Sequence, residues 1–188
     1  MGAAGRLDRD RSQLLIVDVQ ERLAPHVEAN EALMVRCEAL IAAAMAFGIP
    51  KLLTEHCPAQ IGPVVQRLRS RFAPEEIFAK SNFAATDHAE FASRLVQGRD
   101  QLVVAGMEAH VCVMQTVLGL AANGFELFVV ADAVGARAVR QDDRRYALER
   151  MRAAGCTLAG TETVLFEWTR SGDDAAFRET LRIVKSLP

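Results

Sequence analysis

Short apolar runs alternate with longer stretches of helical periodicity along the chain. The apolar runs predict strands at 14–17, 49–54, 76–79, 101–105, 125–131 and 156–159. The intervening and following stretches predict helices at 30–47, 62–70, 86–97, 111–123, 142–154, 162–169 and 174–186. Continuous apolar strands alternating with helices indicate a parallel sheet covered on both faces. We therefore expect one α/β domain over 1–188, with 1–11 as a flexible, solvated lead-in.

Chemically useful side chains follow three of these strands. Asp18 follows the first strand, Lys80 the third, and Cys112 lies in a segment that turns from the fourth strand into a helix. In such sheets ligands bind beyond the carboxyl ends of the strands. Taken singly, the Asp is typical of a turn, the Lys of a solvated surface and the Cys of a core. Their conjunction at one edge of the sheet favours a catalytic interpretation.

Each of the three groups has a chemical part to play. A helix N-terminus and the Lys80 ammonium would both favour the thiolate of Cys112, which predicts a lowered pKa for that thiol. Asp18 could accept the thiol proton and later deliver it to a leaving group. The sequence therefore predicts a cysteine nucleophile that needs no metal.

The motifs at 15–20, 54–55, 78–81 and 106–113 together resemble those of the isochorismatase-like cysteine hydrolases, over Leu14 to about Phe166. The resemblance implies a three-layer α/β/α fold with a six-stranded, mainly parallel sheet in the order 3-2-1-4-5-6. It also implies a triad of Asp18, Lys80 and Cys112, and self-association into a homo-oligomer. In that order the third strand lies two strands from the first, about 10 Å away. Lys80 can therefore reach Asp18 only if its loop leans across the end of the sheet.

The same resemblance implies further features of the site. A non-proline cis peptide is expected between Met107 and Glu108, with the backbone N–H groups of Glu108 and Cys112 as oxyanion donors. Candidates for the wall of the substrate pocket are, by their places near these loops, Leu23, Glu55, Phe83 and Met107. Core packing explains the apolar members of this set equally well.

No cofactor or metal is expected. Nicotinamidases of the family carry an Asp-x-His pattern after the second strand, and the segment 54–60 lacks it, which leaves His56 and Cys57 without partners. His110 is read as a loop or interface residue, because positions two apart on a helix do not face each other. Asp132 and Arg137, after the fifth strand, are interpreted as turn-making residues and members of an ion pair.

Charge and composition restrict the partners. The net charge of −2 gives no reason to expect nucleic acid or an anionic membrane as a partner. No apolar run approaches the ~20 residues that span a bilayer. The 4 cysteines are widely spaced with no CxxC pair, and no export signal is evident, so we expect free thiols in a cytoplasmic protein.

These observations predict a hydrolase that cleaves a small carbonyl substrate, with a C–N amide bond as the first choice, through a Cys112 thioester. Two alternatives stay open. A vinyl-ether hydrolase of the isochorismate kind would rely on an acid and not on the thiol. A non-catalytic, oligomeric binding or scaffold protein would merely retain the triad.

Overall fold

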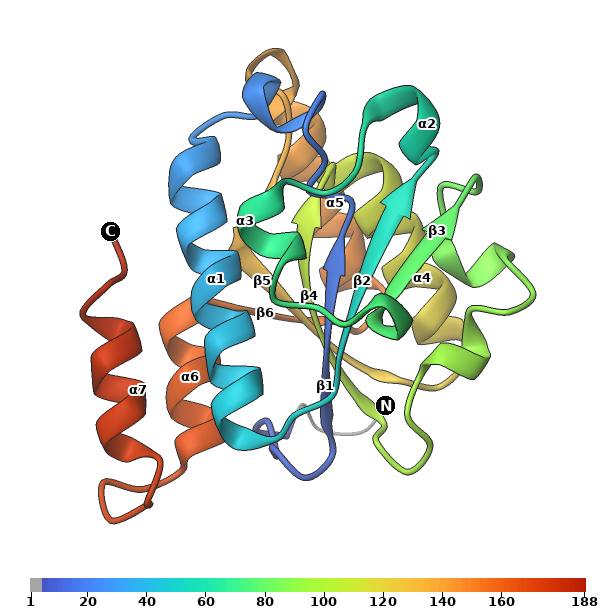
Figure 1. Ribbon diagram of the computed structural model, residues 1–188. Coiled ribbons are helices and arrows are strands. Elements are labelled where there is room, and N and C mark those ends of the chain that lie inside the picture. Colours follow the sequence, from blue (N-terminus) through green and yellow to red (C-terminus); the bar gives the residue numbers. More distant parts are fainter. Residues whose placement is uncertain (1–4) are drawn as a thin grey trace.

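A parallel sheet of six strands lies between two layers of helices in the computed structural model, which describes residues 5–188 (Figure 1). The strand order is β3-β2-β1-β4-β5-β6, and every neighbouring pair is parallel. The predicted fold class and strand order are therefore confirmed. The strands are β1 Ser12–Val17, β2 Lys51–His56, β3 Ile77–Lys80, β4 Gln101–Met107, β5 Glu126–Gly135 and β6 Thr157–Ala159.

The helices divide between the two faces of the sheet. They are α1 Asn30–Phe47, α2 Pro58–Ile61, α3 Gln66–Arg69, α4 Met114–Ala122, α5 Gln141–Ala153, α6 Thr161–Thr169 and α7 Phe177–Val184. Helices α1, α6 and α7 pack on one face, and α4 and α5 cover the other (Figure 1). Within the described part of the chain, none of these helices is both long and apolar enough to cross a membrane.

Each strand contributes side chains to two separate cores because successive residues point to opposite faces. Ile16 of β1 belongs to the core beneath α1, which we call the α1-side core. Leu15 and Val17 belong to the core beneath α4 and α5, the α4-side core. All three side chains are fully buried. This two-sided burial is the physical reason why the strands read as continuous apolar runs in the sequence.

One predicted helix is not formed, and another is shorter than predicted. The segment 86–97 is a connection with short 3-10 turns at Ala85–Asp87 and Ala92–Arg94. Its apolar anchor is Phe91, which is 1% exposed, and a short helix without a longer apolar stripe is marginal. The helix predicted at 62–70 is formed only as α3, Gln66–Arg69. Pro63 lies before it, and a proline disfavours the helical conformation in the residue that precedes it.

The lead-in is more firmly attached than predicted. Residues 1–4 lie outside the described part of the chain, but Leu7 is 2% exposed and packs in the α1-side core. The backbone N–H of Leu7 donates to the Glu167 carboxylate at 2.9 Å, and Arg9 pairs with Asp174 at 2.9 Å. Asp8 and Arg9 thus pair with Arg170 and Asp174, at the end of α6 and in the loop that follows it, whereas Arg11 pairs with Asp100 and Glu126.

Candidate active site

A buried ion pair joins the ends of β1 and β3. The Lys80 Nζ lies 2.6 Å from Asp18 Oδ2, and the two side chains are 0% and 1% exposed. The ammonium also donates to the carbonyl oxygens of Asn82 at 3.2 Å and Phe83 at 3.3 Å. Its three hydrogens therefore all have acceptors. The side chain reaches past the intervening strand β2, as the strand order required.

The second oxygen of the same carboxylate has its own donor. The Thr54 hydroxyl donates to Asp18 Oδ1 at 2.6 Å, and Thr54 is fully buried. Asp18 also adopts a positive φ of 49°, which is uncommon for a residue other than glycine. Thr54 belongs to one of the motifs of the sequence but was not predicted to contact Asp18. The feature that points to it is a hydroxyl residue inside an apolar strand, next to the strand that Asp18 follows.

Cys112 lies in a π-helical turn, Ala109–Val113, that precedes α4. The predicted regular helix from 111 therefore begins later, at Met114. The N–H groups of Val111 and Val113 donate to the Glu108 carbonyl at 3.1 and 3.2 Å, which closes the turn. Cys112 is 6% exposed and packs in the α4-side core. The turn thus holds the sulfur at the carboxyl end of the sheet.

The electrostatic setting of this sulfur differs from the predicted thiolate. Burial raises the pKa of the Cys112 thiol far above its ordinary value, and the Asp18 carboxylate raises it further. The charge and hydrogen bonding of Lys80 act in the opposite direction but do not prevail. Because the ammonium is already neutralised by the carboxylate, it cannot by itself sustain a second anion in a buried site. At neutral pH the resting group is a thiol.

The segment between β4 and Cys112 is held by backbone geometry and by one ion pair. The peptide bond between Met107 and Glu108 is cis, which confirms that expectation. Gly106 has a φ of 127°, and a Cβ there would lie 2.1 Å from the Val17 carbonyl oxygen, so another residue cannot be accommodated. The Glu108 Oε1 accepts from the backbone N–H of Arg137 at 3.2 Å and from its Nε at 2.9 Å.

The ion pair predicted after β5 is therefore present with different partners. Arg137 pairs with Glu108, whereas Asp132 pairs with Arg36 at 3.3 Å. The Asp132 carboxylate also accepts from the backbone N–H of Thr161 at 2.9 Å, at the start of α6. Neither residue is shown to contact the triad, and both fix loops at the carboxyl end of the sheet.

Two of the four candidate pocket residues face away from Cys112. The Glu55 Oε1 accepts from the Val64 N–H at 2.9 Å and from Arg69 Nε at 3.0 Å. Val64 belongs to the α1-side core, and so does Met107, which is fully buried. Cys112 belongs to the opposite core. The alternation of side chains along β2 and β4 thus turns Glu55 and Met107 to the face opposite Cys112, and their part in the substrate pocket stays a prediction.

The other two candidates also stay predictions. Leu23 is partly buried against the α1-side core. Phe83 is 52% exposed, and its ring centroid lies 5.1 Å from that of His56. The main chain of Phe83 is tied to the triad through the Lys80 ammonium. Phe83 thus places a half-exposed ring beside His56, while its carbonyl binds the Lys80 ammonium.

Two histidines lie at the carboxyl end of the sheet: His56 is the last residue of β2, and His110 lies in the turn that carries Cys112. The backbone N–H of His56 donates to Gln20 Oε1 at 2.7 Å, and its carbonyl accepts from Gln20 Nε2 at 2.9 Å. The Nδ1 atoms of His56 and His110 are buried and have no hydrogen-bond partner. Across residues 5–188, no group of three or more His, Cys, Asp or Glu side chains is arranged to hold a metal ion.

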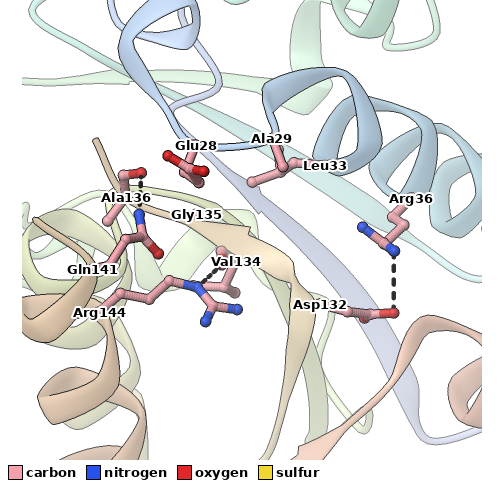
Figure 2. A pocket seen from close by; sticks show the side chains of 10 residues that line it. All are labelled: Glu28, Ala29, Leu33, Arg36, Asp132, Val134, Gly135, Ala136, Gln141 and Arg144. Carbon is pink, nitrogen blue, oxygen red and sulfur yellow. Dashed lines mark hydrogen bonds and ion pairs between the residues drawn. The ribbon is translucent and has the colours of Figure 1, made fainter. Parts of the chain in front are cut away.

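A separate cavity of about 260 Å³ lies between the N-terminal part of α1 and the end of β5 (Figure 2). Arg36 and Asp132 form an ion pair on one side of it, and Arg144 Nε donates to the Val134 carbonyl at 2.7 Å on the other. Among the described residues, those that line this cavity do not include Asp18, Lys80 or Cys112. These charged groups are satisfied by their protein neighbours, so the chemistry is concentrated around the buried ion pair.

Comparison with known proteins gives a consistent family match. The model of the isochorismatase domain matches residues 12–163. Isochorismatase domain-containing protein 2 of Danio rerio is 30% identical over 185 residues, which cover 98% of this chain and 92% of the relative. Isochorismatase domain-containing protein 1 of the same species is 31% identical over 96% of this chain, which spans only 63% of that relative's length.

Three solved structures are similar over nearly the whole chain. The MAR1 ribonuclease of Caenorhabditis elegans has a TM-score of 0.90 at 30% identity, covering 98% of this chain and 95% of that one. The YcaC gene product of Escherichia coli, an octameric hydrolase of unknown specificity, has a TM-score of 0.91 at 28% identity, with coverages of 100% and 93%. YcaC from Pseudomonas aeruginosa, with hexane-2,5-diol and covalent acrylamide, has a TM-score of 0.86 at 29% identity, with coverages of 99% and 98%.

Proposed function

Since this chain belongs to the isochorismatase family of hydrolases, we propose that it cleaves the C–N bond of a small amide through a thioester on Cys112. The observation that carries the proposal is the contact of 2.6 Å between Lys80 Nζ and Asp18 Oδ2, two buried groups that shift the pKa of the Cys112 thiol in opposite directions. Removing two charges from water is costly. Groups arranged in this way around a nucleophilic atom are typical of a catalytic centre.

In the first step, Asp18 acts as the general base. Its carboxylate accepts the proton from Cys112 Sγ while the sulfur attacks the carbonyl carbon, and the carbonyl electron pair moves onto oxygen. The backbone N–H groups of Glu108 and Cys112 would donate to the resulting oxyanion. The Glu108–Arg137 contact at 2.9 Å supports this assignment because it fixes the residue that carries one of the donors.

In the second step, the oxyanion collapses and the C–N bond breaks. Asp18 returns its proton to the leaving nitrogen, which departs as ammonia or an amine. A water molecule then gives a proton to Asp18 and attacks the thioester carbonyl, which releases the carboxylic acid and restores the thiol. Throughout both steps the Lys80 ammonium neutralises the carboxylate and holds it in place.

The raised pKa of Cys112 fits this sequence of events. A resting thiol next to a carboxylate carries one fewer buried anion than a thiolate beside the same carboxylate would. The proton moves only when an electrophilic carbonyl accepts the sulfur's electron pair. A buried neutral thiol is also poorly reactive toward oxidants, because the thiolate is the reactive species.

The covalent acrylamide of one similar structure supports the presence of a reactive nucleophile in this fold. YcaC from Pseudomonas aeruginosa, 29% identical to this chain, carries covalent acrylamide. Acrylamide is both an electrophile that alkylates thiols and a small primary amide. A small planar amide is the substrate class that we propose here, with the exposed Phe83 ring as one wall of its entrance.

The alternatives have less support. Vinyl-ether hydrolysis would leave the Cys112 sulfur without a role, although the Asp18 carboxyl could serve it as an acid. A ribonuclease activity, the name of one similar protein, would require attraction to a polyanion, and the net charge here is −2. A scaffold protein would not need the buried charges.

The experiment is a screen of small primary amides read by ammonia release, with wild type, Cys112→Ala and Cys112→Ser compared. Ammonia release should require Cys112 and be lost in both variants, while circular dichroism shows an unchanged fold. Turnover that persists in Cys112→Ala would contradict the thioester mechanism. Hydrolysis of a vinyl ether by Cys112→Ser at the wild-type rate would favour the isochorismate-type alternative.

We also propose that the protein is a cytoplasmic homo-oligomer. The octameric YcaC product, at 28% identity, is the support for self-association. The described cysteines, Cys37, Cys57, Cys112 and Cys156, are all free thiols, a state that a reducing compartment preserves. Light scattering coupled to size-exclusion chromatography tests the oligomeric state, and a monomer at micromolar concentration would contradict it.

A further inference from the structure

We propose that Thr54 is a positioning residue of the active site, which fixes the Asp18 carboxylate in the orientation that proton exchange with Cys112 requires. The inference rests on the proposed function, since it concerns how Asp18 exchanges a proton with Cys112. The Thr54 hydroxyl is buried, and the proposed roles of Asp18, Lys80 and Cys112 give it no function of its own.

Thr54 holds Asp18 at two points. Its hydroxyl donates to the carboxylate Oδ1 at 2.6 Å, and its backbone carbonyl accepts from the Asp18 N–H at 3.2 Å. The main-chain contact fixes where the residue stands after the end of β1. The side-chain contact fixes the plane of its carboxylate, because Lys80 already holds the other oxygen at 2.6 Å.

The sheet directs the Thr54 side chain to the correct face. Thr54 pairs with Val17 of β1 and with Phe78 of β3. Both of these side chains belong to the α4-side core, which also contains Cys112. Paired residues in a parallel sheet point to the same face, so the hydroxyl lies on the side of the sulfur.

The hydrogen bonds of Thr54 and Lys80 leave defined positions on the Asp18 carboxylate for the proton that comes from Cys112. An ionised carboxylate offers about four lone pairs, two on each oxygen. Lys80 occupies one on Oδ2 and Thr54 one on Oδ1. The remaining lone pairs have a fixed direction, which is what a proton transfer from Cys112 Sγ requires. A free carboxylate would have to be ordered again in each catalytic cycle.

The test uses p-nitrophenyl acetate as an acyl probe, with the burst of p-nitrophenol measured from about pH 5 to about pH 9. Two variants separate the hydroxyl of the Thr54 side chain from its methyl group, and a third variant is a control. Thr54→Val keeps the shape and removes the hydroxyl, whereas Thr54→Ser keeps the hydroxyl and removes the methyl group. Thr169→Val is the matched control, because Thr169 is also buried and its hydroxyl bonds the Leu165 carbonyl within α6.

We expect Thr54→Val to lower kcat about tenfold across this pH range with little change in KM, because the substrate still binds while the carboxylate is no longer held in one plane. Thr54→Ser should restore the wild-type kcat, and Thr169→Val should leave it unchanged. A purely structural role for Thr54 would lower stability without lowering the kcat of the folded protein. Equal kcat values for wild type and folded Thr54→Val would overturn the inference.

The outcome also separates this inference from the proposed function. If the wild-type burst survives in Cys112→Ala, the thioester mechanism fails, and the role of Thr54 fails with it. If the burst depends on Cys112 but Thr54→Val leaves kcat unchanged, only the role of Thr54 is wrong. Should Thr54→Val not fold, Thr54→Ala compared with Thr54→Ser gives the same contrast between the presence and absence of a hydroxyl.

Discussion

Replacing Lys80 by Met removes one half of the buried ion pair and leaves the other half without a countercharge. The Asp18 carboxylate is 1% exposed, so water cannot take the place of the ammonium. The change also removes the donor of the bonds to the Asn82 and Phe83 carbonyls. Breaking a buried pair by removing one partner costs about 3–5 kcal/mol. We expect Lys80→Met to lower the free energy of unfolding by roughly that amount.

The second half of this prediction concerns the double variant. Asp18→Asn combined with Lys80→Met leaves no unpaired charge, so it should be less destabilised than Lys80→Met alone, by about 1 kcal/mol or more. Unfolding in urea, followed by circular dichroism, measures all four forms of the cycle.

Two results would refute the reasoning. A loss below about 0.5 kcal/mol for Lys80→Met would mean that the pair is hydrated or not formed in solution. Additive single effects in the double variant would mean that the two side chains do not interact. Either result would also remove the electrostatic basis of the proposed mechanism.

Two further predictions concern residues outside the triad. Gly106→Ala brings a Cβ to 2.1 Å from a backbone oxygen of β1, so we expect a loss of about 3 kcal/mol or more in urea unfolding, or no folded protein. Gly124→Ala is its control: a Cβ there has open space around it, and the positive φ alone should cost less. Burial raises the pKa of Cys37 from 9.0 to about 12, so its contribution to stability is full below about pH 9 and is lost as the pH rises toward about 12. Cys37→Ala should therefore be less stable than wild type at neutral pH, with a deficit that narrows above about pH 9 in stability measurements across pH; a deficit independent of pH would contradict this.

Much of the fold could be predicted from the sequence because burial on both faces of a parallel sheet leaves a strong local pattern. Helix α1 begins and ends at the predicted residues, Asn30 and Phe47, with Gly48 following it in a left-handed conformation. The failures have local causes. The segment 86–97 lacks an apolar stripe long enough to support a helix, and the helix predicted at 62–70 begins only at Gln66, after Pro63.

The end of β5 and the face taken by two candidate pocket residues could not be predicted from the local sequence, because both depend on neighbours in space. The strand was predicted to end at 131, but it continues to Gly135 because β4 shifts its register between Val104 and Gly106 and pairs with the extra residues. Glu55 and Met107 lie close to the site in sequence but face the other core. Sequence proximity to a motif does not determine which face a side chain takes.

By itself, the sequence determined the fold class, the order of the elements and the identity of the three residues proposed to act together, because each of these follows from local periodicity and recognisable motifs. Only the tertiary structure decided how they interact. Asp18 and Lys80 are 62 positions apart, and their contact depends on a side chain that crosses a strand. The protonation of Cys112 depends on burial and on the balance of two opposite charges. The ion-pair contact and the protonation of the thiol both depend on distances between residues that are far apart in the sequence, so no local pattern determines them.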